Sequence, residues 1–256
     1  MTGYERLRKS LEWVLLPIHR QVAVMLREMV VESESDGKPK LKILDAGGRK
    51  SPYTIGLDAE VSILDLPRET SVQESLNLGL NEDIIKKTAG HRSNIKEIRI
   101  GDMTACPYED DSFDVIVSVE VLEHVDEDEK FVSEVRRVLK TDGIFVMTTP
   151  NGDWVPNTNP DHRRHYRREQ LEEILKLHFD EVDVFYAVIE SPFRKWGIKS
   201  WSPRRPINTI KSMIGNLINN FESGKSSVRI EALKTHHLFA ECRLPKREQE
   251  SVGSSQ

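Results

Sequence analysis

The sequence predicts an α/β fold in which short parallel strands alternate with helices. Short β-branched runs recur along the 256-residue chain, several end in an acid, and segments with helical spacing separate them. The first run begins at Lys42, reaches Asp45 and is followed at once by Gly47 and Gly48. That order is typical of a buried parallel strand entering a loop where bare backbone approaches a ligand. A chain of this length can bury one good core, so we expect one large domain.

The N-terminal segment, residues 1–40, is predicted to be an amphipathic helix and a linker. Its large apolar side chains recur at helical spacing through the first thirty or so positions, at Leu7, Leu11, Val14, Leu15, Ile18, Val22, Met25, Leu26 and Met29. The polar stretch Glu32–Lys40 contains glycine and proline, as linkers do. The main domain is expected to span residues 41–246, and the polar tail, residues 247–256, to be disordered.

Six further apolar runs predict strands. They are Val61–Leu66, Glu97–Met103, Phe113–His124, Gly143–Pro150, Glu181–Val188 and His236–Leu244. The run Thr54–Asp58 also resembles a strand that ends in an acid. It begins too soon after Asp45 to leave room for a crossover connection, which takes at least about ten residues. We therefore assign the second strand to Val61–Leu66, with Asp65 at its tip.

Three helices are predicted between the strands. One covers Asn81–Thr88, and another covers Arg168–His178. The third is expected to begin at a cap, Asp126, and to end at Asp142-Gly143. Its buried face is expected to carry Phe131, Val135, Val138 and Leu139.

Composition narrows the class of protein without choosing a chemistry. A net charge of −5 argues against a general nucleic-acid binder. Cys106 and Cys242 are the only cysteines, so no disulfide framework is implied and a reducing cytoplasm is expected. The apolar stretch Leu11–Ile18 lacks a signal-peptide cleavage pattern, and no stretch is long enough to span a bilayer.

Five short motifs occur along the chain in a fixed order that is typical of one protein family. They are Leu44-Asp-Ala-Gly-Gly48, Leu64-Asp65, Gly101-Asp-Met103, Asp110-Asp-Ser-Phe-Asp-Val-Ile-Val117 and Val119-Glu-Val-Leu-Glu-His124. In this order they resemble the class I S-adenosylmethionine-dependent methyltransferases, closest to the branch that includes the ubiquinone-biosynthesis methyltransferases. The resemblance covers Lys42 to Phe179. It implies S-adenosylmethionine as cofactor and a Rossmann-like seven-stranded sheet of order 3-2-1-4-5-7-6, with strand 7 antiparallel and helices on both faces. A dehydrogenase is not favoured, because the G-x-G-x-x-G pattern is missing.

The cofactor residues follow from the strand tips and from the resemblance. An acid at the tip of the second strand is suited to both ribose hydroxyls, so Asp65, with Leu66 beside it, is assigned that role. The resemblance places Asp45 near the methionine amino group, although it could instead brace the loop of Gly47 and Gly48. It also places Asp102 at the adenine amino group with the Met103 backbone beside the ring, and Glu120 under the cofactor. Asp102 could alternatively be a turn acid.

The catalytic candidates are His165, Tyr166 and His124. In the resembled family the loop after strand five, here Asp153–Arg168, borders the acceptor site. His165 and Tyr166 could orient or deprotonate an acceptor hydroxyl, or the loop could be only a solvated basic start of a helix. His124 could equally be structural, orienting Glu123. No metal is expected, because Asp161, His162 and His165 lack cysteine partners at zinc spacing.

The predicted activity is methyl transfer to a small-molecule, lipid-linked or glycan acceptor, with oxygen as the first choice of atom. Two alternatives stay open. One is an RNA-modifying methyltransferase that uses the basic patch Arg163–Arg168, although nucleic acid is not the favoured partner. The other is a non-catalytic scaffold of the same fold that binds a partner through its insertion.

The insertion, Ser191–Ser227, lies between the last two predicted strands and is not required by a minimal domain of this kind. It mixes aromatic and basic residues and then carries an apolar stripe at helical spacing. The stripe consists of Ile207, Ile210, Met213, Ile214, Leu217, Ile218 and Phe221. Such a stripe should face the core as a lid, another subunit in an oligomer, or a membrane. Basic and aromatic neighbours make residues 193–221 a candidate for peripheral contact with anionic lipid.

Overall fold

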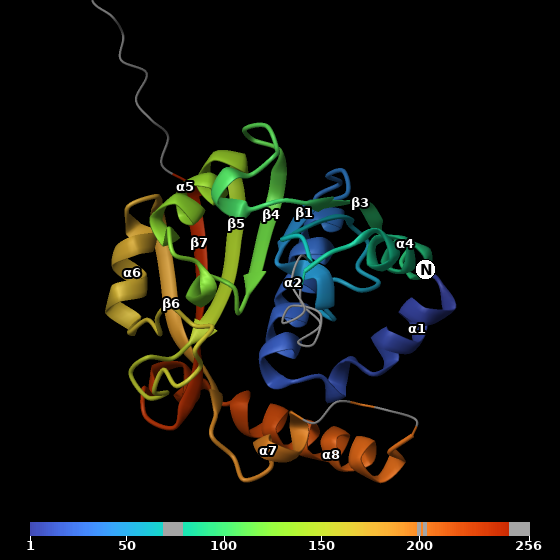
Figure 1. Ribbon diagram of the computed structural model, residues 1–256, viewed down its shortest axis with the longest axis vertical. Helices are drawn as coiled ribbons and strands as arrows, with labels where there is room; N and C mark the ends of the chain where they lie inside the picture. The colour runs from blue at the N-terminus through green and yellow to red at the C-terminus, as the bar shows by residue number, and fades with distance from the viewer. Residues whose placement is uncertain (69–78, 199–200, 202–203, 246–256) are drawn as a thin grey trace, which may run out of the picture.

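A computed structural model describes residues 1–68, 79–198, 201 and 204–245. Within these ranges seven strands form one sheet of order β3-β2-β1-β4-β5-β7-β6 (Figure 1). The strands are β1 Lys42–Ala46, β2 Glu60–Asp65, β3 Ile95–Ile100, β4 Phe113–Val119, β5 Leu139–Pro150, β6 Phe179–Ile189 and β7 Thr235–Pro245. The predicted α/β class and strand order are confirmed. The predicted tail, residues 247–256, lies outside the described residues.

The sheet is parallel except for β7. β1 lies at its centre and pairs in parallel with β2 and β4, so that Ile43 lies beside Val61 and Val115. β7 is antiparallel to both β5 and β6, as predicted, and pairs Thr148 with Phe239. Because β1 is covered on both faces, Ile43–Ala46 is buried throughout.

Helices cover both faces of the sheet (Figure 1). The α-helices of the described residues are α1 Gly3–Ser10, α2 Pro17–Ser35, α4 Glu82–His91, α5 Asp128–Val138, α6 Arg168–Lys176, α7 Arg194–Gly197 and α8 Pro206–Ser223. On one face α2 packs Ile18, Val22 and Leu26 against the sheet. On the other, α5 and α6 bury side chains such as Phe131 and Leu171. Each fully buried side chain of this size contributes about 1.5–3 kcal/mol to the hydrophobic stabilisation. Within the described ranges, no helix combines the length and hydrophobicity that crossing a membrane requires.

The N-terminal segment forms two α-helices joined by a short 3₁₀ helix, where the sequence predicts one helix. α1 ends at Ser10, the short helix η1 spans Glu12–Val14, and α2 begins at Pro17. Proline is tolerated at the first position of a helix but not in its interior, because it lacks an N–H and clashes with the preceding turn. Pro17 therefore starts a new helix and lets the chain turn toward the sheet.

The helix after β4 is shorter than predicted at both ends. It begins at Asp128, and its cap position is Glu127 rather than Asp126. It ends at Val138, and Leu139 already belongs to β5, which starts four residues before the predicted Gly143. The predicted inner face is confirmed, because Phe131, Val135 and Val138 are buried.

Candidate active site

The predicted cofactor residues all gather at the carboxyl end of the parallel strands. Gly47 and Gly48 follow β1, Asp65 ends β2, Asp102 follows β3, and Glu120 follows β4. In open α/β sheets this edge, at the point where the strand order reverses, is where ligands bind. α7 and α8 lie across the same end of the sheet (Figure 1).

The loop after β1 needs both of its glycines for close packing. Gly47 has a φ of +77°, and a Cβ there would lie 2.5 Å from Cγ2 of Val121. A Cβ on Gly48 would lie 2.2 Å from Cγ of Asp45. The backbone N–H of Gly47 donates to the carbonyl of Leu64, which ties the loop to β2 at 2.8 Å. Whether this loop also faces a ligand stays a prediction.

Asp45 stabilises this loop through hydrogen bonds to the residues that follow it. Its side chain is fully buried and accepts hydrogen bonds from Ser51 at 3.0 Å, Tyr53 at 3.1 Å and Thr54 at 3.0 Å. Burial raises the pKa of its carboxyl to about 6, although these hydroxyls and Arg92 act in the opposite direction. Because hydroxyl groups already surround both carboxylate oxygens, the structure favours bracing over the direct contact with the methionine amino group expected from the sequence.

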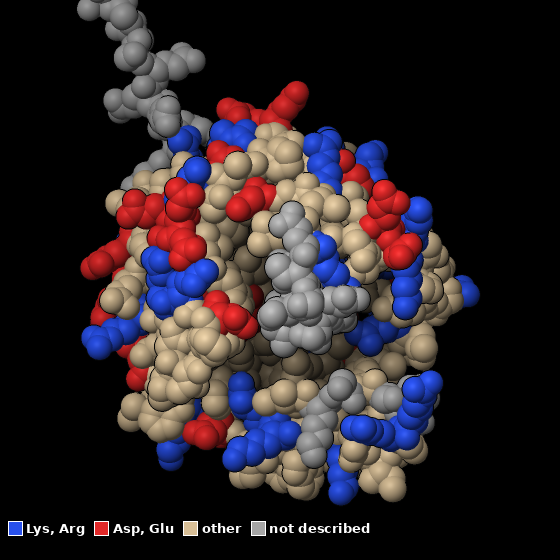
Figure 2. Space-filling view, viewed as in Figure 1, with Lys and Arg blue, Asp and Glu red and all other residues tan. Residues whose placement is uncertain are grey.

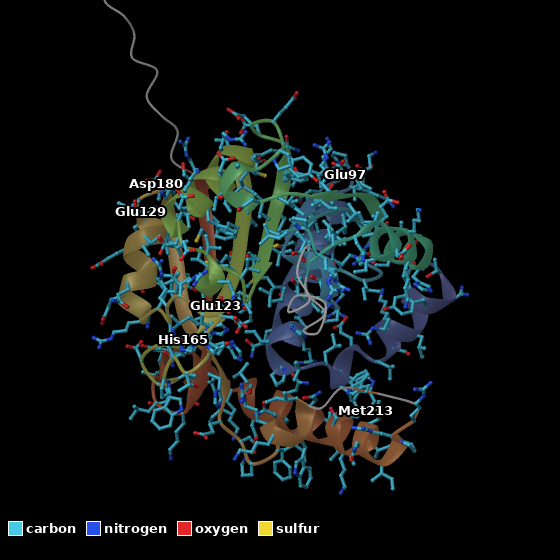
Figure 3. The ribbon with its side chains drawn as sticks, in the orientation of Figure 1. Glu97, Glu123, Glu129, His165, Asp180 and Met213 are labelled. Atoms are coloured by element: carbon cyan, nitrogen blue, oxygen red, sulfur yellow. The ribbon has the colours of Figure 1, made fainter. Side chains whose placement is uncertain are left out.

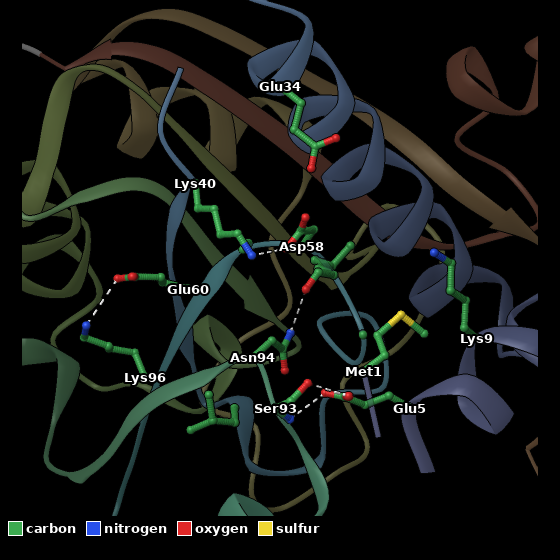
Figure 4. A pocket seen from close by; sticks show the side chains of 14 residues that line it. Met1, Glu5, Lys9, Glu34, Lys40, Asp58, Glu60, Ser93, Asn94 and Lys96 are labelled. Carbon is green, nitrogen blue, oxygen red and sulfur yellow. Dashed lines mark hydrogen bonds and ion pairs between the residues drawn. The ribbon is translucent and has the colours of Figure 1, made fainter. Parts of the chain in front are cut away.

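Asp65 and Asp58, the two candidates for the ribose, lie at opposite ends of β2. Asp65 lies at the carboxyl end, where its carboxylate accepts from the backbone N–H of Leu66 at 2.8 Å and of Arg49 at 3.4 Å. Asp58 precedes β2 and pairs with Lys40. It lines a cavity of about 710 Å³ with other polar and charged side chains at the amino ends of the strands (Figure 4). The ribose role of Asp65 stays a prediction, but its position agrees with it.

Asp102 and Met103 follow β3 in a tight turn. Asp102 accepts the backbone N–H of Thr104 at 2.8 Å and so caps the short helix η3, Met103–Ala105. This is the turn-acid arrangement that the sequence left open beside the adenine role. Met103 is buried, and Leu66, the other predicted neighbour of the cofactor, is largely exposed.

Glu120 forms the centre of a partly buried polar cluster. Its φ of +55° is unusual for a residue with a side chain, and such strain often accompanies functional sites. Its carboxylate accepts from the Thr148 hydroxyl at 2.9 Å and lies 3.1 Å from Nδ1 of His237. Burial raises the pKa of the Glu120 carboxyl, but His237 and the Thr148 hydroxyl outweigh burial and hold that pKa below its ordinary value. Glu120 is therefore ionised at neutral pH.

A cavity of about 220 Å³ lies beside this cluster. Its walls come from the start of α2, the ends of β4 and β6, the start of β7, and α7 with α8. The lining residues are Leu16, Pro17, Ile18, His19, Glu120, Val188, Arg194, Ile198, Asn216, Asn219 and His237. Burial lowers the pKa of His19 to about 4, so His19 is a neutral imidazole. An apolar pocket with a few convergent polar groups is the usual form of a small-molecule site. Sequence reasoning missed His19, Arg194 and His237, because these residues come together only through the fold.

A second group of imidazoles lies next to Glu123. His165 Nδ1 lies 2.9 Å from the carbonyl of Val155, and His165 Nε2 lies 2.8 Å from His162 Nδ1. His124 Nδ1 lies 3.0 Å from the carbonyl of Asp161. Because carbonyl groups only accept, neutral His165 and neutral His124 carry their N–H on Nδ1. His165 Nε2 is then an acceptor, so neutral His162 donates to it from its own Nδ1. His165 thus uses both nitrogens within the protein, which disfavours it as the acceptor's base and makes it a partner that orients His162.

Glu123, His124 and His162 could together hold a divalent metal ion. One ligand atom from each lies within 4.8 Å of the others, and the Nε2 atoms of both histidines keep their lone pairs. Burial, and then repulsion from Glu120, raise the pKa of the Glu123 carboxyl well above its ordinary value. A nearby cation would reverse that effect. The sequence predicted no metal, since only cysteine spacing was considered. Figure 3 shows Glu123 and His165 near the same end of the sheet.

Tyr166 does not face a site. It is buried in the core, and its hydroxyl donates to Asp128 at 2.8 Å. Burial and this carboxylate raise the pKa of its hydroxyl far above the ordinary value. We therefore correct the expectation that Tyr166 orients or deprotonates an acceptor and assign it to holding the start of α5.

Comparisons with known proteins show similarity to methyltransferases. Residues 63–147 match a family model described as a methyltransferase domain. A probable S-adenosylmethionine-dependent methyltransferase of Mycolicibacterium smegmatis is 38% identical over 93 residues, which make up 34% of this chain and 36% of that protein. A ubiquinone biosynthesis O-methyltransferase of Bartonella quintana is 20% identical over 185 residues, or 60% of this chain and 68% of that one. Against the Mycolicibacterium smegmatis protein and three other curated relatives, the chain spans between 31% and 41% of the relative's length.

Solved structures show the same fold. The YcgJ protein of Bacillus subtilis superposes with a TM-score of 0.52 at 14% identity, over 90% of this chain and 99% of that one. A phosphoethanolamine N-methyltransferase of Haemonchus contortus, solved with S-adenosylhomocysteine, gives a TM-score of 0.52 at 16% identity, over 85% of this chain and 52% of that one. Residues 63–147 thus match a methyltransferase domain, and the chain is similar to S-adenosylmethionine-dependent methyltransferases, whose cofactor is S-adenosylmethionine.

Proposed function

We propose that the chain transfers a methyl group from S-adenosylmethionine to a hydroxyl of a small or lipid-linked acceptor held in the 220 Å³ cavity. The observation that carries this proposal is the half-buried pair of Glu120 and His237, 3.1 Å apart, in the wall of that cavity. Glu120 directly follows β4, at the strand edge where the fold binds ligands. The pair therefore adjoins both the proposed cofactor site and the proposed acceptor site.

The chemistry requires alignment and the removal of one proton. Bound S-adenosylmethionine supplies an activated methyl group on a positively charged sulfur, so the protein mainly orients the acceptor. We assign His237 as the group that takes the proton of the acceptor hydroxyl. The ionised Glu120 carboxylate then stabilises the imidazolium that forms, as a carboxylate does beside a catalytic histidine. The apolar wall of the cavity leaves water few partners there, which limits its competition with the acceptor.

The walls of the cavity indicate the kind of acceptor. Leu16, Pro17 and Ile18 offer one apolar wall, and Val188 and Ile198 extend it. This lining suits a carbon skeleton. Arg194 also lines the cavity and carries a charge suited to a carboxylate or phosphate on the acceptor. The Bartonella quintana relative is named as an O-methyltransferase, which supports oxygen as the methylated atom.

The RNA alternative receives little support from the basic patch on which it rested. Arg163 pairs with Asp126 at 3.0 Å, and Arg164 pairs with Asp128 at 2.6 Å. Arg168 is likewise paired, with an acid on its own helix. Carboxylates already neutralise these arginines in part, so the patch is a weak phosphate-binding surface.

The test is turnover on a mixture of natural small molecules. Purified protein, S-adenosylmethionine and a small-molecule extract are incubated, and mass spectrometry follows S-adenosylhomocysteine and any compound that gains one methyl group. We expect a product with the unaltered chain and about a hundredfold less with His237→Ala. His178→Ala is the matched control, because His178 lies between α6 and β6 and does not line the cavity. Binding of S-adenosylmethionine without any turnover would instead support the scaffold alternative.

A further inference from the structure

Helix α8 is amphipathic in the opposite sense from an ordinary surface helix. Its inward residues are polar or small, and all are buried: Ser212, Gly215, Asn216, Asn219, Asn220 and Ser223. Its outward residues are apolar and exposed: Ile207, Ile210, Ile214, Leu217 and Phe221. Phe221 is 79% exposed, whereas Asn219, two residues earlier on the opposite side of the helix, is 1% exposed. The apolar stripe therefore does not cover the core of this chain, which removes the expectation that it is a lid packed by its apolar side chains.

Hydrogen bonds to backbone carbonyls fix the helix in this orientation. Asn216 donates to the carbonyl of Val14 at 3.0 Å, and Asn220 donates to that of Leu15 at 2.9 Å. Asn219 donates to the carbonyl at the end of β6, and Ser212 donates to that of Gly197. If the helix rotated to bury its isoleucines, these carbonyls would lose their donors, at a cost of about 1–3 kcal/mol for each group left buried and unpaired. The exposed apolar face is thus built into the fold.

Close contact with α7 reinforces this arrangement. A Cβ on Gly215 would lie 2.8 Å from the carbonyl of Phe193, so the two helices approach each other backbone to backbone. Trp196 and Ile198, which are also largely exposed, extend the apolar surface from α8 onto α7 and the residue after it. Contiguous apolar surface of this kind marks an interaction site.

The charge of the same segment identifies the occupant. Residues 191–227 contain seven lysines and arginines and one acid, whereas the whole chain has a net charge of −5. Arg205 and Lys211 are exposed near the start of the apolar face, and Lys225 is exposed just beyond its end. Figure 2 shows mostly basic side chains over the part of the surface where α7 and α8 lie. A second copy of the chain docked by symmetry on this face would bring these like charges together.

We propose that α8 docks the protein on a membrane surface rich in anionic lipid, with its apolar face in the headgroup region and its basic residues on the lipid phosphates. A helix with one apolar face flanked by lysine and arginine has the composition of helices that lie in a membrane interface. The inner side of α8 contributes Asn216 and Asn219 to the 220 Å³ cavity. Docking would therefore bring that cavity to the lipid surface. The role of the cavity as an acceptor site rests on the proposed function, whereas the docking of α8 does not.

Vesicle sedimentation tests the proposal with the full chain. The protein is mixed with vesicles of phosphatidylcholine alone or with added phosphatidylglycerol, at low and at high salt. We expect pelleting with the anionic vesicles, weakened by salt because salt screens the attraction between basic residues and lipid. The variant Ile210→Ser/Ile214→Ser should partition at least about tenfold more weakly. Leu177→Ser removes an exposed leucine elsewhere and should bind as the unaltered chain does.

Three results would overturn the proposal. The first would be failure of the unaltered chain to pellet in any condition, a result that does not depend on how the variants fold. The second would be pelleting of the double variant as strongly as that of the unaltered chain. The third would be a dimer in sedimentation equilibrium that the double variant loses, which would assign the face to a second copy. Turnover plays no part in these measurements, so failure of docking is distinguishable from failure of the proposed methyl transfer.

Discussion

Replacement of Asp65 should weaken S-adenosylmethionine binding, and replacement of Asp58 should not. Asp65 ends β2 at the edge that carries the glycine loop, whereas Asp58 precedes β2 at the opposite edge and pairs with Lys40. Only a residue at the first edge can reach a ligand bound beside Gly47. The variants Asp65→Ala and Asp58→Ala are therefore a matched pair of changes to one residue type at the two ends of one strand.

The size of the effect follows from the bonds that Asp65 already makes. A hydrogen bond to a charged group contributes about 1.5–3 kcal/mol, and two ribose hydroxyls offer two such bonds. Asp65 is half-buried, and its two carboxylate oxygens already accept backbone N–H groups of Leu66 and Arg49. Solvent and this competition reduce the net gain to that of about one bond. We therefore expect a loss of about 2 kcal/mol, or roughly a thirtyfold higher Kd.

Isothermal titration calorimetry measures both affinities, with circular dichroism to show that each variant is folded. If Asp58→Ala weakens binding more than Asp65→Ala, or if Asp65→Ala leaves the Kd unchanged, the assignment of the ribose to the tip of β2 is wrong.

Three further predictions concern the polar groups around the site. Tyr166→Phe should lower the free energy of unfolding by about 1 kcal/mol, because it removes one buried hydrogen bond, and should leave turnover unchanged; a large loss of turnover would contradict our reassignment of this residue. Asp45, whose folded pKa of about 6 exceeds its ordinary 3.8, is ionised less readily in the folded state, so it lowers stability as pH rises through that window. Asp45→Asn should remove this loss, seen as a smaller fall in stability between about pH 4 and pH 6 in denaturant titrations, and an unchanged pH profile would show that the buried Asp45 carboxyl does not cause it. His165→Ala should reduce turnover less than His237→Ala and leave S-adenosylmethionine affinity unchanged, since His165 acts through His162; the opposite order in steady-state kinetics would restore His165 as the acceptor's base.

The parts of the site that local sequence patterns encode could be predicted. Each parallel strand is a short apolar run, and the residue that follows it must lie at the carboxyl edge of the sheet. That rule is enough to place Gly47, Asp65, Asp102 and Glu120 at one edge. Connection length favours Asp65 over Asp58, because a crossover needs more residues than the few that separate Asp45 from Thr54.

The cavity could not be predicted, because its residues are distant in sequence. His19 comes from the start of α2, Arg194 from α7 and His237 from β7. The position of His237 depends on β7 inserting antiparallel next to β5, where His237 pairs with Pro150. No local pattern around His237 distinguishes it from an ordinary strand residue.

Helix α8 shows where the rule of hydrophobic periodicity gives the wrong face. The spacing of its isoleucines correctly predicts a helix, but the usual inference that the apolar stripe faces the protein fails. The asparagines face inward, because the backbone carbonyls of Val14, Leu15 and Ile189 need donors there. Only the tertiary structure brings those carbonyls to the helix. The N-terminal helix is divided for a simpler reason, because Pro17 fits the first turn of a helix and not its interior.

The most direct test of the proposed activity follows the methyl group itself. S-Adenosylmethionine labelled with ¹³C in its methyl group is incubated with the protein and a small-molecule extract, and NMR identifies the atom to which the labelled carbon becomes attached. We predict a labelled methyl carbon bonded to oxygen, formed by the unaltered chain and nearly absent with His237→Ala. A label on nitrogen or carbon, or S-adenosylmethionine that binds and stays intact, would contradict the proposed transfer to a hydroxyl.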